Sequence, residues 1–170
     1  MFREAARAHR HAVGTTWRVD ETYVRLNGTW TYMYRAIDQD GQVVDAYFST
    51  RRNAQAAQAF FERAMRETGI TPERVTTDTA TWYPPALRVV LPHVVHRRSR
   101  YLNNGIERDH GQLKQRVRPM RGFKRARSID LLARGHAFIQ NVRNGYSRRT
   151  AHLPRALRLA AAWPQLTRVI

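Results

Sequence analysis

Apolar and aromatic residues gather in three short stretches in the first third of the chain, in the manner of β-strands. These stretches are residues 17–26, 30–37 and 43–48, and short polar turns separate them. Asn27 and Gly28 between the first two stretches form one of the strongest two-residue hairpin signals. The pattern therefore predicts three consecutive antiparallel strands.

The hydrophobic period becomes helical after residue 53. Asn53 is a good N-cap, apolar residues then recur at helical spacing, and Gly69 ends the predicted helix. Two short strands are predicted next, over 75–77 and at 94–95, with a brief helix around 86–91 between them. Three helices follow: one over 104–117, one that begins after a cap at Ser128, and one over 155–163 after Pro154. This order of elements is that of a ribonuclease H-like α/β domain. We therefore predict a mixed five-stranded sheet with three antiparallel strands first, flanked by helices.

Three widely separated carboxylates stand out against this pattern. Asp20 lies inside an apolar strand, where aspartate is depleted, Asp78 ends the fourth strand, and Glu107 opens a helix. Each has an ordinary explanation: a solvent-facing edge strand for Asp20, a helix cap for Asp78, and a capping box with Asn104 for Glu107. Together, however, they form a set of oxygen ligands that suits Mg²⁺ or Mn²⁺.

The predicted helix over 104–117 presents two neighbouring faces. Glu107, His110 and Lys114 share one face, and Ile106, Leu113 and Val117 form an apolar face that we expect to pack on the sheet. Glu21 should point to the face of the sheet opposite Asp20, so we do not expect it to share a metal.

Charge narrows the choice of substrate. The 170-residue chain has 30 Lys and Arg against 13 Asp and Glu, a formal net charge of +17, which favours binding to phosphate polyanions. Between residues 97 and 127, eleven basic residues face only two acids, whereas a solvated face usually mixes signs. We predict that this segment binds DNA, through Lys114, His110, Arg116, Arg118, Arg121, Lys124 and Arg125.

The composition of the chain excludes cysteine-based sites and membrane-spanning segments. The chain has no cysteine, which excludes disulfides and cysteine-based zinc sites, and it has no apolar stretch of membrane-spanning length. We therefore expect no membrane association.

These motifs together resemble transposases of the insertion-sequence-six family, whose catalytic domain is similar to a retroviral integrase core. The resemblance rests on residues 17–24, 34–38, 49–53, 101–111 and 118–124. It implies a DDE transposase that cleaves the ends of an insertion element and transfers the strands. Asp20 would bridge two Mg²⁺ or Mn²⁺ ions, Asp78 and Glu107 would each hold one, and Lys114 would be the basic residue of the extended motif.

The resemblance also implies a domain organisation and a setting. Residues 1–16 would be a linker remnant, 17–150 the catalytic domain, and 151–170 a C-terminal helix that packs on or extends it. Family members usually begin with a helix-turn-helix domain, so this chain reads as N-terminally truncated. We expect DNA and a second copy of the chain as partners, in the bacterial cytoplasm at the nucleoid.

Two features depart from the family, and two other functions stay open. Only 28 residues separate Asp78 from Glu107, and Asp78 is followed by Thr79 rather than a basic residue. One alternative is a catalytically silent remnant that binds DNA or dimerises with an intact transposase. Another is a ribonuclease H-type nuclease.

Overall fold

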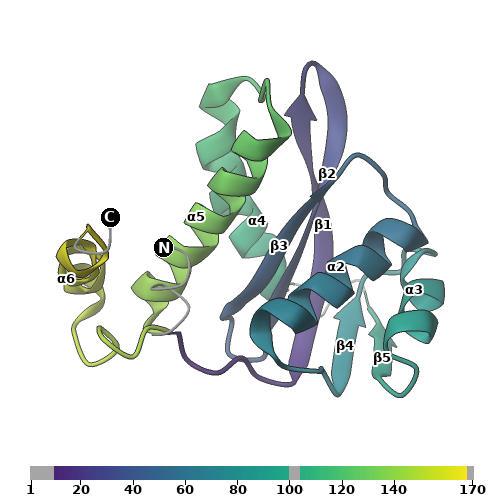
Figure 1. Cartoon of the computed structure of the whole chain (residues 1–170), viewed down its shortest axis with the longest axis horizontal. Coiled ribbons are helices and arrows are strands. Elements are labelled where there is room, and N and C mark those ends of the chain that lie inside the picture. Colours follow the sequence, from purple (N-terminus) through teal and green to yellow (C-terminus); the bar gives the residue numbers. More distant parts are fainter. Residues whose placement is uncertain (1–9, 100–103, 168–170) are drawn as a thin grey trace.

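A mixed sheet with strand order β3-β2-β1-β4-β5 forms the centre of the molecule (Figure 1). The computed structural model describes residues 10–99 and 104–167. The strands are β1 (Thr16–Leu26), β2 (Thr29–Asp38), β3 (Val43–Ser49), β4 (Arg74–Thr77) and β5 (Val95–Arg98). The first three pair antiparallel, whereas β4 and β5 run parallel to β1. The predicted five-stranded sheet with three antiparallel strands first is therefore confirmed.

Helices cover both faces of this sheet (Figure 1). One face carries α2 (Ala54–Thr68) and α3 (Tyr83–Val90), and the other carries α4 (Asn104–Val117) and α5 (Ala126–Asn144). A short 3-10 turn, η1 (Arg118–Met120), follows α4, and α6 (Arg155–Thr167) packs on α5. Among the described residues, none of the helices combines the length and apolar character needed to cross a bilayer.

Alternation along β1 divides the core between the two faces. Trp17 and Val19 pack with Phe60 of α2 and Tyr83 of α3, in the larger cluster. Val24 instead belongs to a second cluster with Leu113 of α4 and Ile129 of α5. Asp20 shares the side of β1 that faces α4, because side chains on a strand alternate between the two faces.

Several local predictions are confirmed at residue level. Asn27 (φ 49°) and Gly28 (φ 79°) both adopt the positive φ that a tight hairpin requires. Asn53 caps α2 by accepting a hydrogen bond from the Ala56 amide at 2.9 Å. Gly69 ends α2 in the left-handed conformation (φ 71°), as the sequence predicts.

Other boundaries were predicted wrongly. The last long helix is not capped by Ser128, because α5 begins at Ala126 with Arg125 at the N-cap position. The helix expected around 86–91 begins at Tyr83, since prolines are tolerated in the first helical turn. Strand β5 lies at Val95–Arg98 rather than 94–95.

Residues 10–15, which precede β1, contact the body of the domain. The Arg10 guanidinium donates to the Val44 carbonyl at 3.1 Å, and the His11 amide donates to the Tyr146 carbonyl at 3.1 Å. These contacts hold the entry to β1 beside the end of α5. The division into 1–16, 17–150 and 151–170 stays a prediction.

Candidate active site

Asp20 and Asp78 lie side by side on the neighbouring inner strands β1 and β4, at the point where β4 ends. The parallel register that pairs Thr16 with Arg74 places each aspartate four residues further along its own strand. Asp20 is in the middle of β1, and Asp78 follows directly after β4. Oxygens of Asp20, Glu21 and Asp78 all lie within 4.8 Å of one another. We call these three residues the acidic cluster.

Asp20 lies in an environment that disfavours its charge. Its side chain is 19% exposed, and its pKa is raised from 3.8 to about 7. Burial is the main cause, followed by the negative charge of Glu21 and then those of Asp78 and Glu107, against one hydrogen bond from the Glu21 amide. A divalent cation would relieve this repulsion, so the donor set fits such an ion.

Glu21 points toward α2 and α3, away from the face that carries Asp20, as alternation along β1 predicts. Its carboxylate nevertheless reaches the acidic cluster, and its not sharing a metal stays a prediction. The Arg52 guanidinium binds this carboxylate at 2.6 Å, and the Tyr83 hydroxyl donates to its other oxygen. Arg52 in turn lies 4.4 Å from the Trp82 ring centre. Glu21 is therefore neutralised within the protein, whereas Asp20 and Asp78 are left for an external cation.

Asp78 is not a helix cap. Helix α3 begins five residues later, and its N-cap position is Trp82. The Asp78 carboxylate instead accepts a hydrogen bond from the Ala80 amide at 2.9 Å, which shapes the loop after β4. The alternative that a cap alone explains this residue does not hold.

Glu107 lies near the acidic cluster but does not belong to it. It is exposed on the first turn of α4, outside the group of oxygens within 4.8 Å. Its charge nevertheless contributes to raising the pKa of Asp20. The structure thus brings Asp20 and Asp78 together and leaves Glu107 at the rim of the same site.

His110 is turned inward, which corrects its assignment as a DNA contact. It is 5% exposed, and its Nδ1 lies 3.5 Å from an Asp20 oxygen. Burial and the positive charges of Arg35 and Lys114 lower its pKa to about 3, so it is neutral at pH 7. A buried neutral imidazole is poorly suited to binding a DNA phosphate. It is placed instead to support Asp20.

Arg35 is a buried cation that the sequence analysis missed. It pairs with Asp20 in the register of β1 and β2 and is fully buried on the α4 side. Its position inside an apolar strand, between Tyr34 and Ala36, was the available signal. Buried charges are seldom found without a partner.

The remaining predicted DNA contacts form an exposed basic surface. It runs from the second half of α4 through η1 to the start of α5. We call it the basic track, and its members are Lys114, Arg116, Arg118, Arg121, Lys124 and Arg125, all of them exposed. The basic track begins at Lys114, two helical turns after Glu107 on α4. The acidic side of the site therefore lies beside the N-terminal end of the track.

The strand order and the flanking helices define the class of fold, a ribonuclease H-like domain. The structure is similar to the simian T-cell lymphotropic virus intasome (TM-score 0.59, 16% identity, 86% of this chain and 57% of that one). It is also similar to the catalytic core of BIV integrase (TM-score 0.54, 16% identity, 89% and 98%). At these identities the similarity establishes the fold alone.

Within that class, the chain belongs to the DDE domain family DDE_Tnp_IS240, which matches residues 14–146. It is 38% identical over 109 residues to the transposase for insertion sequence-like element IS431mec of Staphylococcus aureus. The transposase for IS257 in transposon Tn4003, also from S. aureus, has the same identity. The match covers 59% of this chain and 46% of each relative, so the chain spans about half their length.

Proposed function

We propose that this chain is the catalytic domain of a DNA transposase, which cleaves the ends of an insertion element and joins them to target DNA. The observation that carries the proposal is the pair Asp20 and Asp78, held side by side where β4 ends beside the middle of β1. The family match and the curated relatives, all transposases where their function is named, agree with this chemistry.

The acids fit divalent cations. In this proposal Asp20, Asp78 and Glu107 hold two Mg²⁺ or Mn²⁺ ions, and a related fold, the HTLV-2 integrase core, was solved with magnesium (TM-score 0.51, 17% identity, 62% of this chain and 71% of that one). When bound there, such ions would supply activation of the attacking oxygen and stabilisation of the leaving oxygen in a displacement at phosphorus.

The chain's own side chains orient and balance these acids. His110 lies against Asp20 and restricts the orientation of its carboxylate. Because His110 is neutral, it does not offset the negative charge of Asp20. Arg52 and Tyr83 bind the Glu21 carboxylate, and Arg52 offsets its negative charge beside Asp20. Lys114, exposed two turns beyond Glu107, is placed to bind a phosphate of the DNA strand that enters the site.

The basic track positions the DNA backbone. Phosphate contacts position a protein without reading sequence, so this surface contributes affinity rather than choice of site.

We further propose that the protein acts as a homodimer at the bacterial nucleoid, in the cytoplasm. Cross-linking and a measurement of the protein's mass in solution, each with and without DNA, would test the dimer. A monomer in both states would refute it.

Metal-dependent nicking of supercoiled plasmid tests the catalytic proposal. We expect no nicking with Mg²⁺ or Mn²⁺ from any of the variants Asp20→Asn, Asp78→Asn and Glu107→Gln. Each variant should still bind DNA. Asp40→Asn, which changes an exposed acid in the turn after β2, is the matched control and should nick like the parent. A parent protein that binds DNA but never nicks it would favour the silent-remnant alternative.

Charge reversal tests the basic track. Arg116→Glu, Arg118→Glu and Arg121→Glu should weaken DNA binding, and each lost phosphate contact should flatten the salt dependence by about 0.9 in log–log slope. Arg88→Glu, at an exposed position on α3, is a control away from the track. Equal losses for control and track variants would place the DNA elsewhere.

A further inference from the structure

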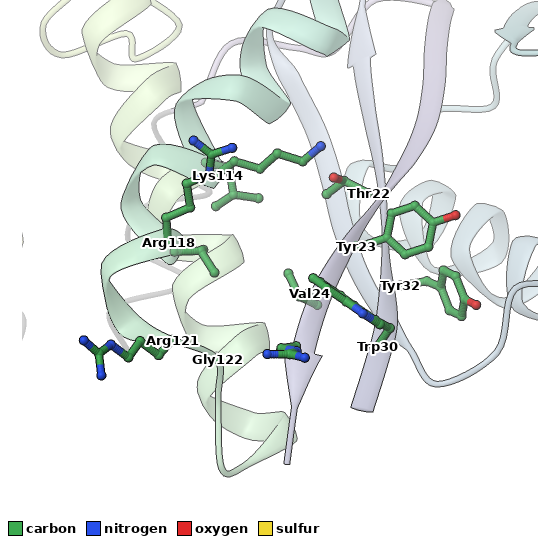
Figure 2. A pocket seen from close by; sticks show the side chains of 12 residues that line it. Thr22, Tyr23, Val24, Trp30, Tyr32, Lys114, Arg118, Arg121 and Gly122 are labelled. Carbon is green, nitrogen blue, oxygen red and sulfur yellow. The ribbon is translucent and has the colours of Figure 1, made fainter. Parts of the chain in front are cut away.

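A groove of about 940 Å³ lies between the β1–β2 hairpin and the end of α4 (Figure 2). It opens because β4 pairs with β1 only over Thr16–Arg18. Beyond that point, within the described residues, the edge of β1 meets no strand until Leu26 bridges to Phe123. The floor of the groove is apolar and includes Val24, Leu113 and Val117.

The two walls of the groove carry different chemistry. The helical wall presents Lys114 and Arg118, and in Figure 2 the Lys114 side chain extends toward Thr22 on the hairpin. Three aromatic residues of the hairpin, Tyr23, Trp30 and Tyr32, also line the groove. In Figure 2 the Trp30 ring extends toward Val24, whereas the Tyr23 and Tyr32 rings point away from α4. No acidic residue is among the described residues that line the groove.

The aromatic rings are exposed yet held in place. Trp30 is 57% exposed and Tyr23 is 45% exposed, which is unusual for such large apolar surfaces. Tyr23 contacts Trp30 edge-on, with ring centres 6.2 Å apart, and Tyr32 lies 5.4 Å from Tyr23. The Arg25 guanidinium lies 5.1 Å from the Trp30 ring centre. The rings are thus organised before any ligand binds, which lowers the entropy cost of binding.

The groove also leads away from the acidic cluster. Thr22, on its lining, is two residues beyond Asp20 on the same face of β1. The position opposite Trp30 is Arg25, five residues beyond Asp20, or roughly 17 Å at about 3.3 Å per residue. That length corresponds to about five base steps at 3.4 Å each.

We propose that this groove binds an unpaired DNA strand next to the cleaved phosphate, with a base stacked on Trp30. Bases inside a duplex already stack on each other, so an exposed ring gains a base only where the strands have separated. Lys114 and Arg118 bind the phosphates of that strand from the opposite wall. The inference rests on the proposed function, because it assigns the strand to the substrate of the same site.

Binding of three labelled DNAs to the whole chain at one physiological salt concentration tests the inference. The probes are a 20-nucleotide single strand, a blunt duplex of the same length, and a duplex with five unpaired nucleotides at one end. Trp30→Ala should weaken binding of the single strand and the forked duplex by roughly 5- to 150-fold, the range of one base–aromatic stack. The blunt duplex should bind nearly as before, and Trp30→Phe should recover much of the loss.

The matched control is Trp163→Ala, which removes a tryptophan of similar exposure (56%) on α6. Circular dichroism and the melting temperature of each variant verify that it is folded. Salt titration separates stacking from phosphate contact: Trp30→Ala should leave the salt slope unchanged, whereas Lys114→Ala should reduce it.

Three outcomes would overturn the inference. In the first, Trp30→Ala and Trp163→Ala bind the single strand alike. In the second, Trp30→Ala weakens the blunt duplex as much as the forked one. In the third, the parent binds duplex but no unpaired DNA. All three leave the proposed transposase function standing, whereas a parent that binds none of the probes would refute both.

Discussion

Removing the Asp20 charge should stabilise the folded protein at neutral and alkaline pH. In the folded state the pKa of Asp20 is about 7, against 3.8 ordinarily, so ionising this residue opposes folding. The difference corresponds to roughly 4 kcal/mol at about 1.36 kcal/mol per pKa unit. Asp20→Asn carries no such charge and should escape this cost.

The sign of the pH dependence follows from proton linkage. Between about pH 4 and pH 7 the folded state retains a proton that the unfolded state has released, so parent stability falls as pH rises through this window. Below it both states are protonated, and above it the full penalty applies. The advantage of Asp20→Asn over the parent should therefore grow by roughly 2–3 kcal/mol from pH 5 to pH 8.

Urea unfolding of both proteins at pH 5 and pH 8 measures this difference. Asp40→Asn controls for the removal of one negative charge from a strongly basic chain. Mg²⁺ at pH 8 should stabilise the parent more than Asp20→Asn, since an ion bound to the folded state alone shifts the equilibrium by mass action. An advantage for Asp20→Asn that is equal at both pH values would refute the reasoning.

Three further predictions concern stability. Arg52→Ala should cost roughly 3 kcal/mol in urea unfolding, because it leaves the buried Glu21 carboxylate without its ion pair, whereas the exposed neighbour Arg51→Ala should cost under about 0.5 kcal/mol. His110→Gln should reduce the loss of stability between pH 6.5 and pH 3, because with the lowered pKa of His110 only the unfolded state binds a proton on this histidine in that range. An unchanged fall of the unfolding free energy over this pH range would contradict this prediction. Asn53→Ala should lower the melting temperature by an amount equivalent to about 1 kcal/mol, and Asn53→Ser should restore it.

Much of the fold follows from local signals in the sequence. Three apolar-rich stretches bounded by turn signals predict β1 to β3, and their long buried runs reflect core on both faces of the sheet. Asn27, Gly28, Asn53 and Gly69 mark ends through backbone requirements that act over a few residues. The start of α5 was misplaced because the sequence offers Ser128 as a cap, whereas the structure begins the helix at Ala126 without any side-chain cap.

The candidate site was predictable in part, and the division has a physical reason. The pairing of Asp20 with Asp78 follows from parallel register, which element order already implies. The position of Glu21 does not, because alternation gives the face of a residue but not how far a long side chain reaches around the edge of a strand. Arg52 and Tyr83, which hold Glu21, come from distant elements and no local pattern connects them to β1.

The separation of charges explains how a basic protein can hold acids where a polyanion must bind. The basic track attracts phosphates along α4 and η1, while Asp20 and Asp78 repel any phosphate that reaches the end of that track. Arg52 already offsets Glu21, so the charge that remains at the site is that of Asp20 and Asp78, with Glu107 at the rim. Under the proposed function, DNA and divalent cation should therefore bind cooperatively, each lowering the electrostatic cost of the other. DNA affinity of the parent should rise with Mg²⁺ relative to a monovalent salt of equal ionic strength. The double variant Asp20→Asn with Asp78→Asn should bind DNA at least as well without Mg²⁺ and lose that dependence, and a dependence equal to the parent's would show that the ion acts elsewhere.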